Sequence, residues 1–432
     1  MNLLLLHPTI VPMTSVCDRP YTASVGIAGN RIVLISNDEA SLDRFRANYD
    51  GCREIDCTGR ILMPGLVNTH GHIAMTLQRS YADDIALMEW LNERIWPFEA
   101  RQTPDDIACG AELGIAEMLL GGTTSFVDMY WHEAEVARVA ERTGIRALLC
   151  ASCLDSNMAD FEADFQKLAT HTSPRVRAGI GPHAPYSVSA ENLRHCRALA
   201  DRYGVPLTIH VAETRDELKI VSERSGMTPV QYLASLGLFD GPTIAAHCIH
   251  LTDDDIDILR RHSVQVAHNP TSNMKMGSGA APVSKMLEAG VSVSIGTDGC
   301  CSNNDVDMWE EMRNASFLQK VATMNPLALP AYKVLEMATV GGATAMGYDD
   351  LGMIREGALA DLIVIDTAAP HLHPTHDVIS NLVYCCKAAD VRTVIVDGRI
   401  VVEEGKIVGI DLEALYKCAE EAARRIAGAA HI

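Results

Sequence analysis

Residues 176–213, "VRAGIGPHAPYSVSAENLRHCRALADRYGVPLTIHVAE", contain the unit from which the fold of this chain can be predicted. The apolar runs at its two ends are typical of buried strands, and the segment between them is typical of an amphipathic helix with a capping residue ahead of it. A strand, a helix and a second strand in this order place the two strands parallel in one sheet. The unit therefore predicts an α/β fold.

Strand-like runs of this kind occur eight times between residues 61 and 354, and helical segments such as 253–263 separate them. The runs are residues 61–70, 123–129, 146–154, 176–184, 206–213, 243–250, 263–270 and 291–299. Eight strand–helix repeats are the signature of a (β/α)8 barrel, also called a TIM barrel. We therefore predict that residues 61–354 form such a barrel.

The two ends of the chain are also rich in strands. Residues 1–60 contain a predicted hairpin through Gly29 and Asn30, and residues 355–410 contain further strand-like runs. Neither end looks able to build a core alone. We therefore predict one small composite β-sandwich from residues 1–60 and 355–432, the second part ending in a helix that Asp411 caps.

The composition limits the partners. The chain has 432 residues, 48% of them apolar, with 56 acidic and 36 basic residues and a net charge of −20. An acidic surface repels phosphate backbones and anionic lipids, so we expect a small-molecule substrate, no nucleic acid polymer and no membrane. The opening "MNLLLLHPTIVPM" predicts a short strand rather than a secretory leader. The 13 scattered cysteines fit a reducing cytoplasm, and we expect a homo-oligomer there.

Histidines and carboxylates collect at the carboxyl ends of the predicted strands. They are His70 and His72 on the first strand, His183 on the fourth, His210 and Glu213 on the fifth, His247 on the sixth, His268 on the seventh and Asp298 on the eighth. In a barrel, the carboxyl ends of the strands carry the active site. One histidine at a strand end would be ordinary, but this many at one face predict a functional site.

The spacing of His70 and His72 favours a pair of metal ligands. Residues i and i+2 of a strand point to the same side, so both imidazoles can face the barrel axis while Gly71 lets the backbone pass close. His210 adds a third nitrogen and Asp298 adds an oxygen. This mixed set suits one divalent ion per chain, zinc as the first choice and iron as the second, with a position open for water.

Two other pairs of residues imitate metal motifs. His371 and His373 lie in "PHLHPTH", between prolines and far from any matching ligand, so we predict a surface loop there. Cys150 and Cys153 form a CxxC pattern inside a strand-like run, which favours a structural role over zinc binding or redox chemistry.

With these residues in place, the sequence resembles the amidohydrolase superfamily, in the branch of 5′-methylthioadenosine/S-adenosylhomocysteine deaminases and related chlorohydrolases. The motifs that carry the resemblance lie between residues 64 and 313: "PGLVNTHGH", "GPHAPYSVS", "IHVAET", "AAHCIHL", "AHNPTSNMKMGSG" and "GTDGCCSNNDVDMWEEMR". The resemblance implies one metal ion held by His70, His72, His210 and Asp298. The sequence agrees, because the third and fourth strands contain no lysine to bridge two metals.

The resemblance also implies a mechanism. The metal would lower the pKa of its water. Asp298 would accept the water's proton and later deliver it to the leaving amine. Glu213, the glutamate of "HxxE", would protonate a ring nitrogen as hydroxide attacks the adjacent amidine carbon. His247 would polarise the water or steady the oxyanion, and ammonia would then leave.

Substrate contacts follow from the same resemblance. His183 corresponds to a histidine that contacts the nucleoside, and Trp90 and Glu99 correspond to a segment that covers the sugar and bonds its hydroxyl groups. Ser302 and Asn303 follow Asp298 closely, and we expect them to line the pocket.

The sequence departs from the pattern of this family at one point. S-adenosylhomocysteine carries an amino-acid carboxylate that needs a cation. Members that accept it can place arginines after the third strand, but residues 150–166 here contain neither Arg nor Lys. This favours adenine nucleosides without that tail, such as 5′-methylthioadenosine, adenosine or 5′-deoxyadenosine.

Three alternatives stay open at this point. The same frame can remove chloride or alkylamine from a triazine-like ring, and it can deaminate a free purine or pterin base. The third alternative is an inactive barrel that serves as a binding or scaffold protein, which the intact set of metal and proton-transfer residues disfavours.

Overall fold

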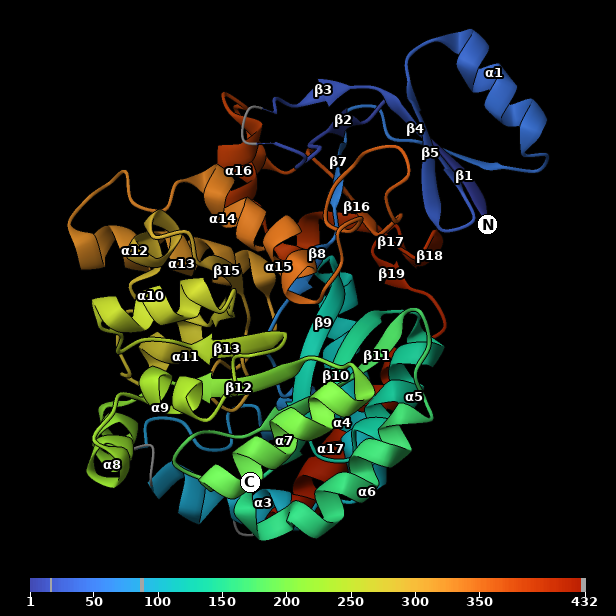
Figure 1. Cartoon of the computed structure of the whole chain (residues 1–432). Helices are drawn as coiled ribbons and strands as arrows, with labels where there is room; N and C mark the ends of the chain where they lie inside the picture. The colour runs from blue at the N-terminus through green and yellow to red at the C-terminus, as the bar shows by residue number, and fades with distance from the viewer. Residues whose placement is uncertain (16–17, 86–88, 429–432) are drawn as a thin grey trace.

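The computed structural model describes residues 1–15, 18–85 and 89–428 (Figure 1). Within them, eight parallel strands form one sheet in which each strand pairs with its neighbours in sequence. The strands are β8 (Leu66–Asn68), β9 (Thr123–Tyr130), β10 (Arg146–Cys153), β11 (Val176–Pro182), β12 (Leu207–Val211), β13 (Thr243–His247), β14 (Gln265–His268) and β15 (Ser292–Ile295). The predicted (β/α)8 barrel is confirmed.

Hydrogen bonds across a seam bring the first and last strands together. The Thr69 N–H donates to the Ile295 carbonyl oxygen at 3.0 Å, and the Asp298 N–H donates to the His70 carbonyl oxygen at 2.9 Å. All eight residues of β9 and all eight of β10 are buried, as expected for strands covered on both faces. The seam also brings His70 and Asp298 to the same end of the barrel.

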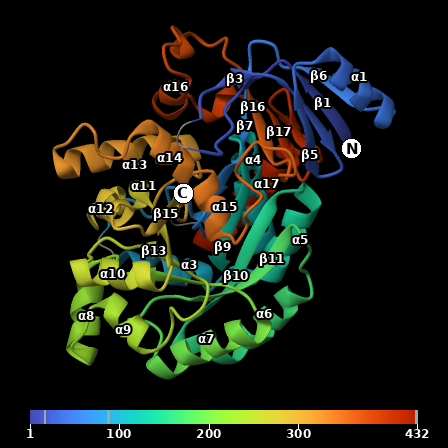
Figure 2. The ribbon, with the colours of Figure 1, turned by 45° about the horizontal axis from the view of Figure 1, so that its top comes forward.

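Helices form the outer layer of the barrel (Figures 1 and 2). They are α4 (Pro104–Leu120), α5 (Glu133–Thr143), α6 (Met158–Ala169), α7 (Ala190–Tyr203), α8 (Arg215–Ser225), α9 (Pro229–Ser235), α10 (Asp253–Arg261), α11 (Pro270–Lys275), α12 (Val283–Glu288), α13 (Met308–Thr323), α14 (Ala331–Met337) and α15 (Val340–Ala345). Side-chain caps begin several of them: Ser189 accepts the Asn192 N–H ahead of α7, and Thr252 forms a capping box ahead of α10.

Two further sheets lie beside the barrel. A four-stranded sheet contains β1 (Asn2–Leu6), β4 (Ser24–Ala28), β5 (Arg31–Ser36) and β6 (Arg53–Asp56). A seven-stranded sheet contains β2 (Thr9–Ile10), β3 (Tyr21–Thr22), β7 (Ile61–Pro64), β16 (Leu362–Ile365), β17 (Val391–Val396), β18 (Arg399–Glu403) and β19 (Lys406–Ile407). Both ends of the chain build the larger sheet, as Figure 1 shows where β7 lies beside β16. Apolar side chains from both ends, among them Leu3 and Leu362, share one core.

The remaining helices complete the fold. They are α1 (Glu39–Asn48), α16 (Val378–Tyr384), α17 (Leu412–Ala427), the short helices η1 (Ile73–Gln78), η2 (Trp90–Ile95) and α3 (Trp96–Glu99) before α4, and the single turns η3 (Asp155–Asn157), η4 (Pro370–Leu372) and η5 (Ala388–Asp390). Asp411 caps α17 as predicted. Helix α17 packs in a common apolar cluster with Leu77 of η1 and Phe98 of α3, so it supports two segments that border the barrel mouth.

The first predicted barrel strand, residues 61–70, needs a correction. Residues Ile61–Pro64 form β7, which pairs with β16 and β2, and only Leu66–Asn68 belong to the barrel. The chain passes between the sheets at Gly65, where an added Cβ would lie 2.2 Å from the side chain of Thr124. His70 and His72 accordingly follow β8 instead of lying in it. The domain limits at residues 61 and 355 stay a prediction.

Candidate active site

A cavity of about 760 Å³, including its open mouth, lies at the carboxyl ends of the barrel strands. Most of the residues that the sequence singled out line it: His72, Trp90, Glu99, His183, His210, Glu213, His247, Asp298 and Ser302. Tyr130 and Trp131, which the sequence reasoning missed, line it as well. Their only signal was an aromatic pair directly after the second predicted strand.

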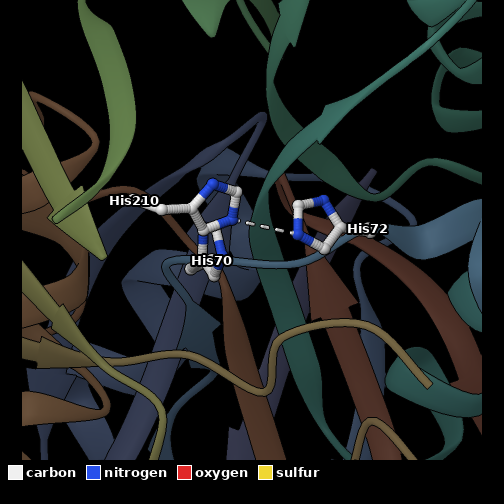
Figure 3. Close-up of side chains that lie close together, drawn as sticks. All are labelled: His70, His72 and His210. Carbon is white, nitrogen blue, oxygen red and sulfur yellow. Dashed lines mark hydrogen bonds between the residues drawn. The ribbon is translucent and has the colours of Figure 1, made fainter. Parts of the chain in front are cut away.

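At the bottom of the cavity, the predicted metal ligands converge. The ligand atoms of His70, His72 and His210 lie within 4.8 Å of one another (Figure 3). Asp298 Oδ1 lies 3.3 Å from His72 Nε2 and 3.6 Å from His70 Nε2. Strands far apart in the sequence therefore bring three imidazoles and one carboxylate together, as the predicted ligand set requires.

Hydrogen bonds fix how two of these imidazoles face the centre. His72 Nδ1–H donates to the Met129 carbonyl oxygen at 2.6 Å, and His210 Nδ1–H donates to the His183 carbonyl oxygen at 2.7 Å. In the neutral form, which metal binding requires, each ring presents the lone pair of Nε2, and these two atoms lie 3.3 Å apart. Two lone pairs at this distance repel unless an electrophile lies between them.

His70 adds a second observation. Its side chain is fully buried, and neither ring nitrogen has a hydrogen-bond partner among the described residues. A buried polar group without a partner costs folding free energy. The donor set of three imidazoles and one carboxylate therefore fits a divalent metal ion of the zinc type.

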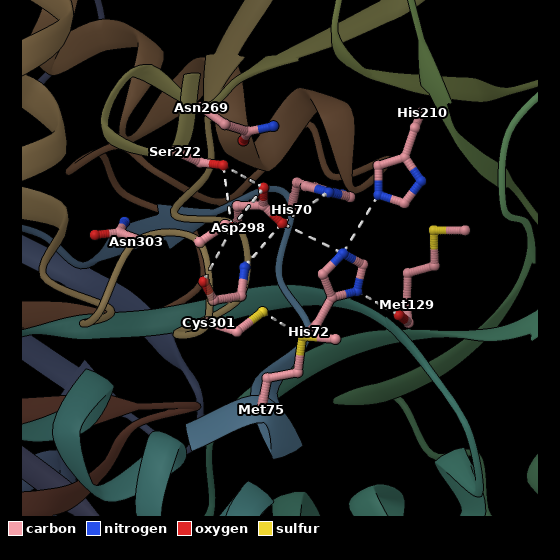
Figure 4. Close-up of polar contacts among 12 residues, drawn as sticks. His70, His72, Met75, Met129, His210, Asn269, Ser272, Asp298, Cys301 and Asn303 are labelled. Atoms are coloured by element: carbon pink, nitrogen blue, oxygen red, sulfur yellow. Dashed lines mark hydrogen bonds and ion pairs between the residues drawn. The ribbon is translucent and has the colours of Figure 1, made fainter. Parts of the chain in front are cut away.

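Three neighbouring polar groups hold the Asp298 carboxylate. Ser272 donates to Oδ2 at 2.7 Å, Ser302 donates to Oδ2 at 3.2 Å, and the Gly299 N–H donates to Oδ1 at 2.8 Å (Figure 4). Oδ1 is left facing His70 and His72. Ser272 was not singled out from the sequence, although it lies in the motif that follows the seventh predicted strand.

Glu213 and His247 stand beside this centre. His247 Nε2 lies 3.8 Å from Glu213 Oε2 and 3.9 Å from Asp298 Oδ2, and His247 Nδ1–H donates to Asn273 Oδ1 at 2.9 Å. Burial raises the pKa of Glu213 above that of an exposed glutamate. A carboxyl group with a raised pKa can hold a proton closer to neutral pH, which suits a general acid.

The backbone is strained at His247, at its neighbour Cys248 and at Asp298. His247 has φ 70°, Cys248 has φ 50° and Asp298 has φ 65°. Each such conformation costs roughly 1–3 kcal/mol in a residue other than glycine, so the surrounding structure must enforce it. The hydrogen bonds from the Cys248 N–H to the Val211 carbonyl oxygen and from the Asp298 N–H to the His70 carbonyl oxygen contribute to this.

Glu99 approaches the cavity from a different direction. It ends helix α3, and its Oε1 accepts a hydrogen bond from the Tyr130 hydroxyl at 2.7 Å. Burial raises the pKa of Glu99 to about 7, against the opposing effect of the Tyr130 hydrogen bond. Trp90 and Trp131 line the cavity with it. A carboxylate between aromatic side chains can bind hydroxyl groups of a ring-shaped ligand.

The remaining lining residue of the predicted set is His183. Its Nδ1 lies 2.7 Å from the Ser187 hydroxyl, which in turn donates to the Ala184 carbonyl oxygen. Burial, together with nearby imidazoles, lowers the pKa of His183 to about 4, so the ring is neutral. A neutral ring whose Nδ1–H is engaged offers Nε2 to a ligand.

The profile of the Amidohydrolase family matches residues 61–401. The chain belongs to the amidohydrolase family. It is 44% identical over 431 residues to a 5-methylthioadenosine/S-adenosylhomocysteine deaminase of Pelotomaculum thermopropionicum, with 98% of this chain and 99% of the relative covered. It is 43% identical over 411 residues to a 5′-deoxyadenosine deaminase of Methanothermobacter thermautotrophicus, with 93% and 96% covered.

Solved structures agree with this fold. An adenosine deaminase from Xanthomonas campestris with bound zinc superposes with a TM-score of 0.93 at 35% identity over 98% of each chain. An atrazine chlorohydrolase from Arthrobacter aurescens complexed with zinc has a TM-score of 0.89 at 24% identity over 98% of this chain and 100% of the other. At that identity the second likeness shows the fold alone.

Asn303 of this amidohydrolase does not line the cavity, contrary to the prediction. Its Nδ2 donates to the Thr297 carbonyl oxygen and to Glu311 Oε1, both at 2.8 Å. The side chain therefore braces the turn after β15 from behind. Because Asn303 is close to Asp298 in sequence, it was expected at the cavity. The sequence does not show on which side of the turn the Asn303 side-chain amide lies.

His371 and His373 lie outside the cavity, as expected. His371 Nε2 pairs with Asp390 at 2.8 Å, and His373 is exposed. Cys150 and Cys153 are buried in β10, where Cys153 Sγ lies 3.3 Å from Cys196 Sγ. Among the described residues, neither the histidine pair nor the cysteine pair belongs to a group of side chains that could hold a metal ion.

Two observations concern charge and membranes. Along the described part of the chain, the residues that line the cavity include no lysine and no arginine. In that same part, no helix combines the length and the apolar composition needed to cross a bilayer.

Proposed function

We propose that this amidohydrolase is a hydrolytic deaminase of adenosine-type nucleosides, which it converts to the inosine analogue and ammonia. One observation carries the proposal: a single cavity contains two sets of groups. At its base lie a ligand set for a divalent ion, Glu213 and His247, and elsewhere on its wall lies the carboxylate of Glu99. The names of the relatives, which include methylthioadenosine, 5′-deoxyadenosine and adenosine deaminases, support the same substrate class.

The metal belongs to the same proposal. When bound to His70, His72, His210 and Asp298, one divalent ion, zinc first and iron second, would supply the Lewis acidity that lets water attack near neutral pH. The protein contributes the orientation of the ligands, because Met129 and the His183 carbonyl hold His72 and His210 in one tautomer.

Proton transfer falls to three side chains. Asp298 accepts the proton of the attacking water and passes it to the leaving amine, and hydrogen bonds from Ser272 and Ser302 orient its carboxylate within the cavity. Glu213 holds a proton for the ring nitrogen next to the attacked carbon. Burial opposes protonation of His247, but the nearby carboxylates of Glu213 and Asp298 raise its pKa. The protonated ring, with its Nδ1–H bonded to Asn273, donates from Nε2–H to the oxygen that develops negative charge.

Direct elemental analysis tests the metal. We expect about one equivalent of divalent ion per wild-type chain, as a single site of this ligand set binds one ion. His72→Ala should lose the ion, whereas His373→Ala, the matched control at an exposed histidine, should keep it. Two equivalents per wild-type chain would contradict the assignment.

The substrate tail gives a separate prediction. Because the described cavity lining has no lysine and no arginine, the carboxylate of S-adenosylhomocysteine should find no such cationic partner there. A hydrogen bond to a charged group contributes roughly 1.5–3 kcal/mol, so a substrate that carries an unpaired charge should lose about tenfold or more in kcat/KM. We therefore expect 5′-methylthioadenosine and adenosine to exceed S-adenosylhomocysteine in steady-state assays. A clear preference for S-adenosylhomocysteine would mean that a cation reaches the tail from elsewhere.

The triazine and free-base alternatives share the metal and the proton-transfer residues. Glu99 disfavours both, because neither substrate offers sugar hydroxyls to this carboxylate of the cavity wall. A screen of ammonia release over adenosine analogues, free purines, pterins and triazines separates the three possibilities. A cytoplasmic homo-oligomer, acting on a small molecule and not on nucleic acid or membranes, remains a prediction from the composition.

A further inference from the structure

The end of strand β9 contacts both halves of the cavity. Asp128 Oδ1 accepts the Ile73 N–H at 2.7 Å, directly after the ligand His72. Two residues further along, Tyr130 donates its N–H to Glu133 Oε1 at 2.9 Å and its hydroxyl to Glu99 Oε1 at 2.7 Å. The end of β9 therefore contacts both the backbone next to the metal ligand His72 and the carboxylate of Glu99. The carboxylates of Asp128 and Glu133 accept two of these hydrogen bonds.

We propose that Asp128 and Glu133 are positioning residues of this site, Asp128 for the metal ligand His72 and Glu133 for Tyr130 and, through it, Glu99. The inference rests on the proposed function, because it takes His72 as a ligand and Glu99 as the group that binds the sugar.

Asp128 and its neighbour Met129 hold the segment around His72 at two points. Ile73 is the first residue of η1, and its N–H is one of the donors that a helix start leaves without an internal partner. Asp128 satisfies that donor, while the carbonyl of the next residue, Met129, accepts the His72 Nδ1–H at 2.6 Å. Adjacent residues of one strand therefore fix both the backbone after His72 and its ring.

The chain turns sharply between the end of β9 and Glu133, the first residue of α5. His132 has φ 54°, a left-handed conformation that lies between β9 and the first residue of α5. After this turn the Glu133 carboxylate reaches back to the Tyr130 N–H. This bond fixes the exit of the strand, and with it the direction in which the Tyr130 ring enters the cavity wall and meets Glu99.

These two carboxylates also carry a cost in folding free energy. Asp128 is fully buried and Glu133 is 1% exposed, and the second oxygens, Asp128 Oδ2 and Glu133 Oε2, have no hydrogen-bond partner among the described residues. Buried carboxylates that are only partly bonded disfavour folding. An apolar side chain would avoid that cost, but it could not accept the N–H of Ile73 or of Tyr130.

Zinc affinity tests the role of Asp128. Loss of a partner that orients a metal ligand typically lowers metal affinity about 10- to 100-fold, and we expect this for Asp128→Ala in competition between the protein and a chelator. Asp128→Asn keeps an acceptor oxygen and should restore affinity to near the wild-type value. If Asp128→Ala fails to fold, Asp128→Leu, which has the same branching of heavy atoms and no acceptor, replaces it. Zinc affinity equal to wild type in the folded variant without an acceptor would overturn the role of Asp128.

A double-mutant cycle tests the role of Glu133. Glu133→Ala and Tyr130→Phe should each lower kcat/KM on adenosine by about tenfold, mainly through KM, with zinc affinity unchanged. Glu133→Gln should restore most of the loss. In a Glu99→Ala background the two substitutions should have almost no further effect, because they act through Glu99. Fully additive losses would overturn this role.

The same measurements separate a failure of this inference from a failure of the proposed function. Wild-type protein that binds no zinc, or Glu99→Ala protein with full activity, would remove the metal site or the sugar site itself. Wild-type zinc binding and a Glu99→Ala defect, combined with silent Asp128→Ala and Glu133→Ala variants, would refute the positioning roles alone.

Discussion

Replacing Glu213 with glutamine should lower kcat by on the order of 10² to 10⁴, the usual cost of removing a positioned general acid or base. Glutamine keeps the shape of the side chain but cannot supply the proton that the ring nitrogen needs. Burial raises the pKa of Glu213, so the wild-type group can carry that proton nearer to neutral pH than an exposed glutamate could. Steady-state kinetics with adenosine, alongside metal analysis of the same preparation, measure the effect.

The metal content of Glu213→Gln should equal that of wild type, because Glu213 is not among the groups that could hold the ion. Glu223→Gln, an exposed carboxylate on helix α8, which begins two residues after Glu213, is the matched control and should keep full activity. Wild-type turnover in Glu213→Gln would refute the assigned proton transfer, and a loss of metal would place Glu213 among the ligands.

The second large effect concerns Glu99. A carboxylate can accept two hydrogen bonds from a vicinal diol, each contributing roughly 1.5–3 kcal/mol, so Glu99→Ala should lower kcat/KM on adenosine-type nucleosides at least ~10²-fold. Free adenine, which has no diol, should be a poor substrate of both proteins. Comparison of adenosine with adenine across the two proteins therefore isolates the contribution of the sugar.

Glu93→Ala is the control for this comparison, since Glu93 is an exposed glutamate of the neighbouring helix η2. It should match wild type on every substrate. If Glu99→Ala lost activity equally on adenosine and on a substrate without sugar hydroxyls, Glu99 would act on the cavity as a whole, and the free-base and triazine alternatives would gain support.

The sequence by itself determined the barrel and the core of its site. Eight apolar runs separated by helical segments left few other folds open, and a parallel barrel brings the carboxyl ends of its strands to one face. His70, His72, His210 and Asp298 could therefore be grouped without knowing any distance. The chemistry of the donors, three imidazoles and one carboxylate, then indicated the class of metal.

The tertiary structure decided what depends on long-range pairing. The pattern of an apolar run such as Ile61–Pro64 is equally compatible with the barrel and with the neighbouring sheet. Only its pairing with β2 and β16 assigns it to the neighbouring sheet. In the same way, closeness in sequence to Asp298 could not show that Asn303 faces Thr297 and Glu311 behind the cavity.

The orientation of the ligands was also beyond the sequence. The tautomer of His72 depends on the Met129 carbonyl, 57 residues away along the chain, and the direction of Glu99 depends on the hydroxyl of Tyr130. Spacing and residue type say which groups can reach the barrel mouth. Hydrogen bonds decide which nitrogen of a histidine carries the proton and which carboxylate oxygen is already bonded. Each bond needs its two partners within about 3 Å, so these bonds form only when the strands have paired.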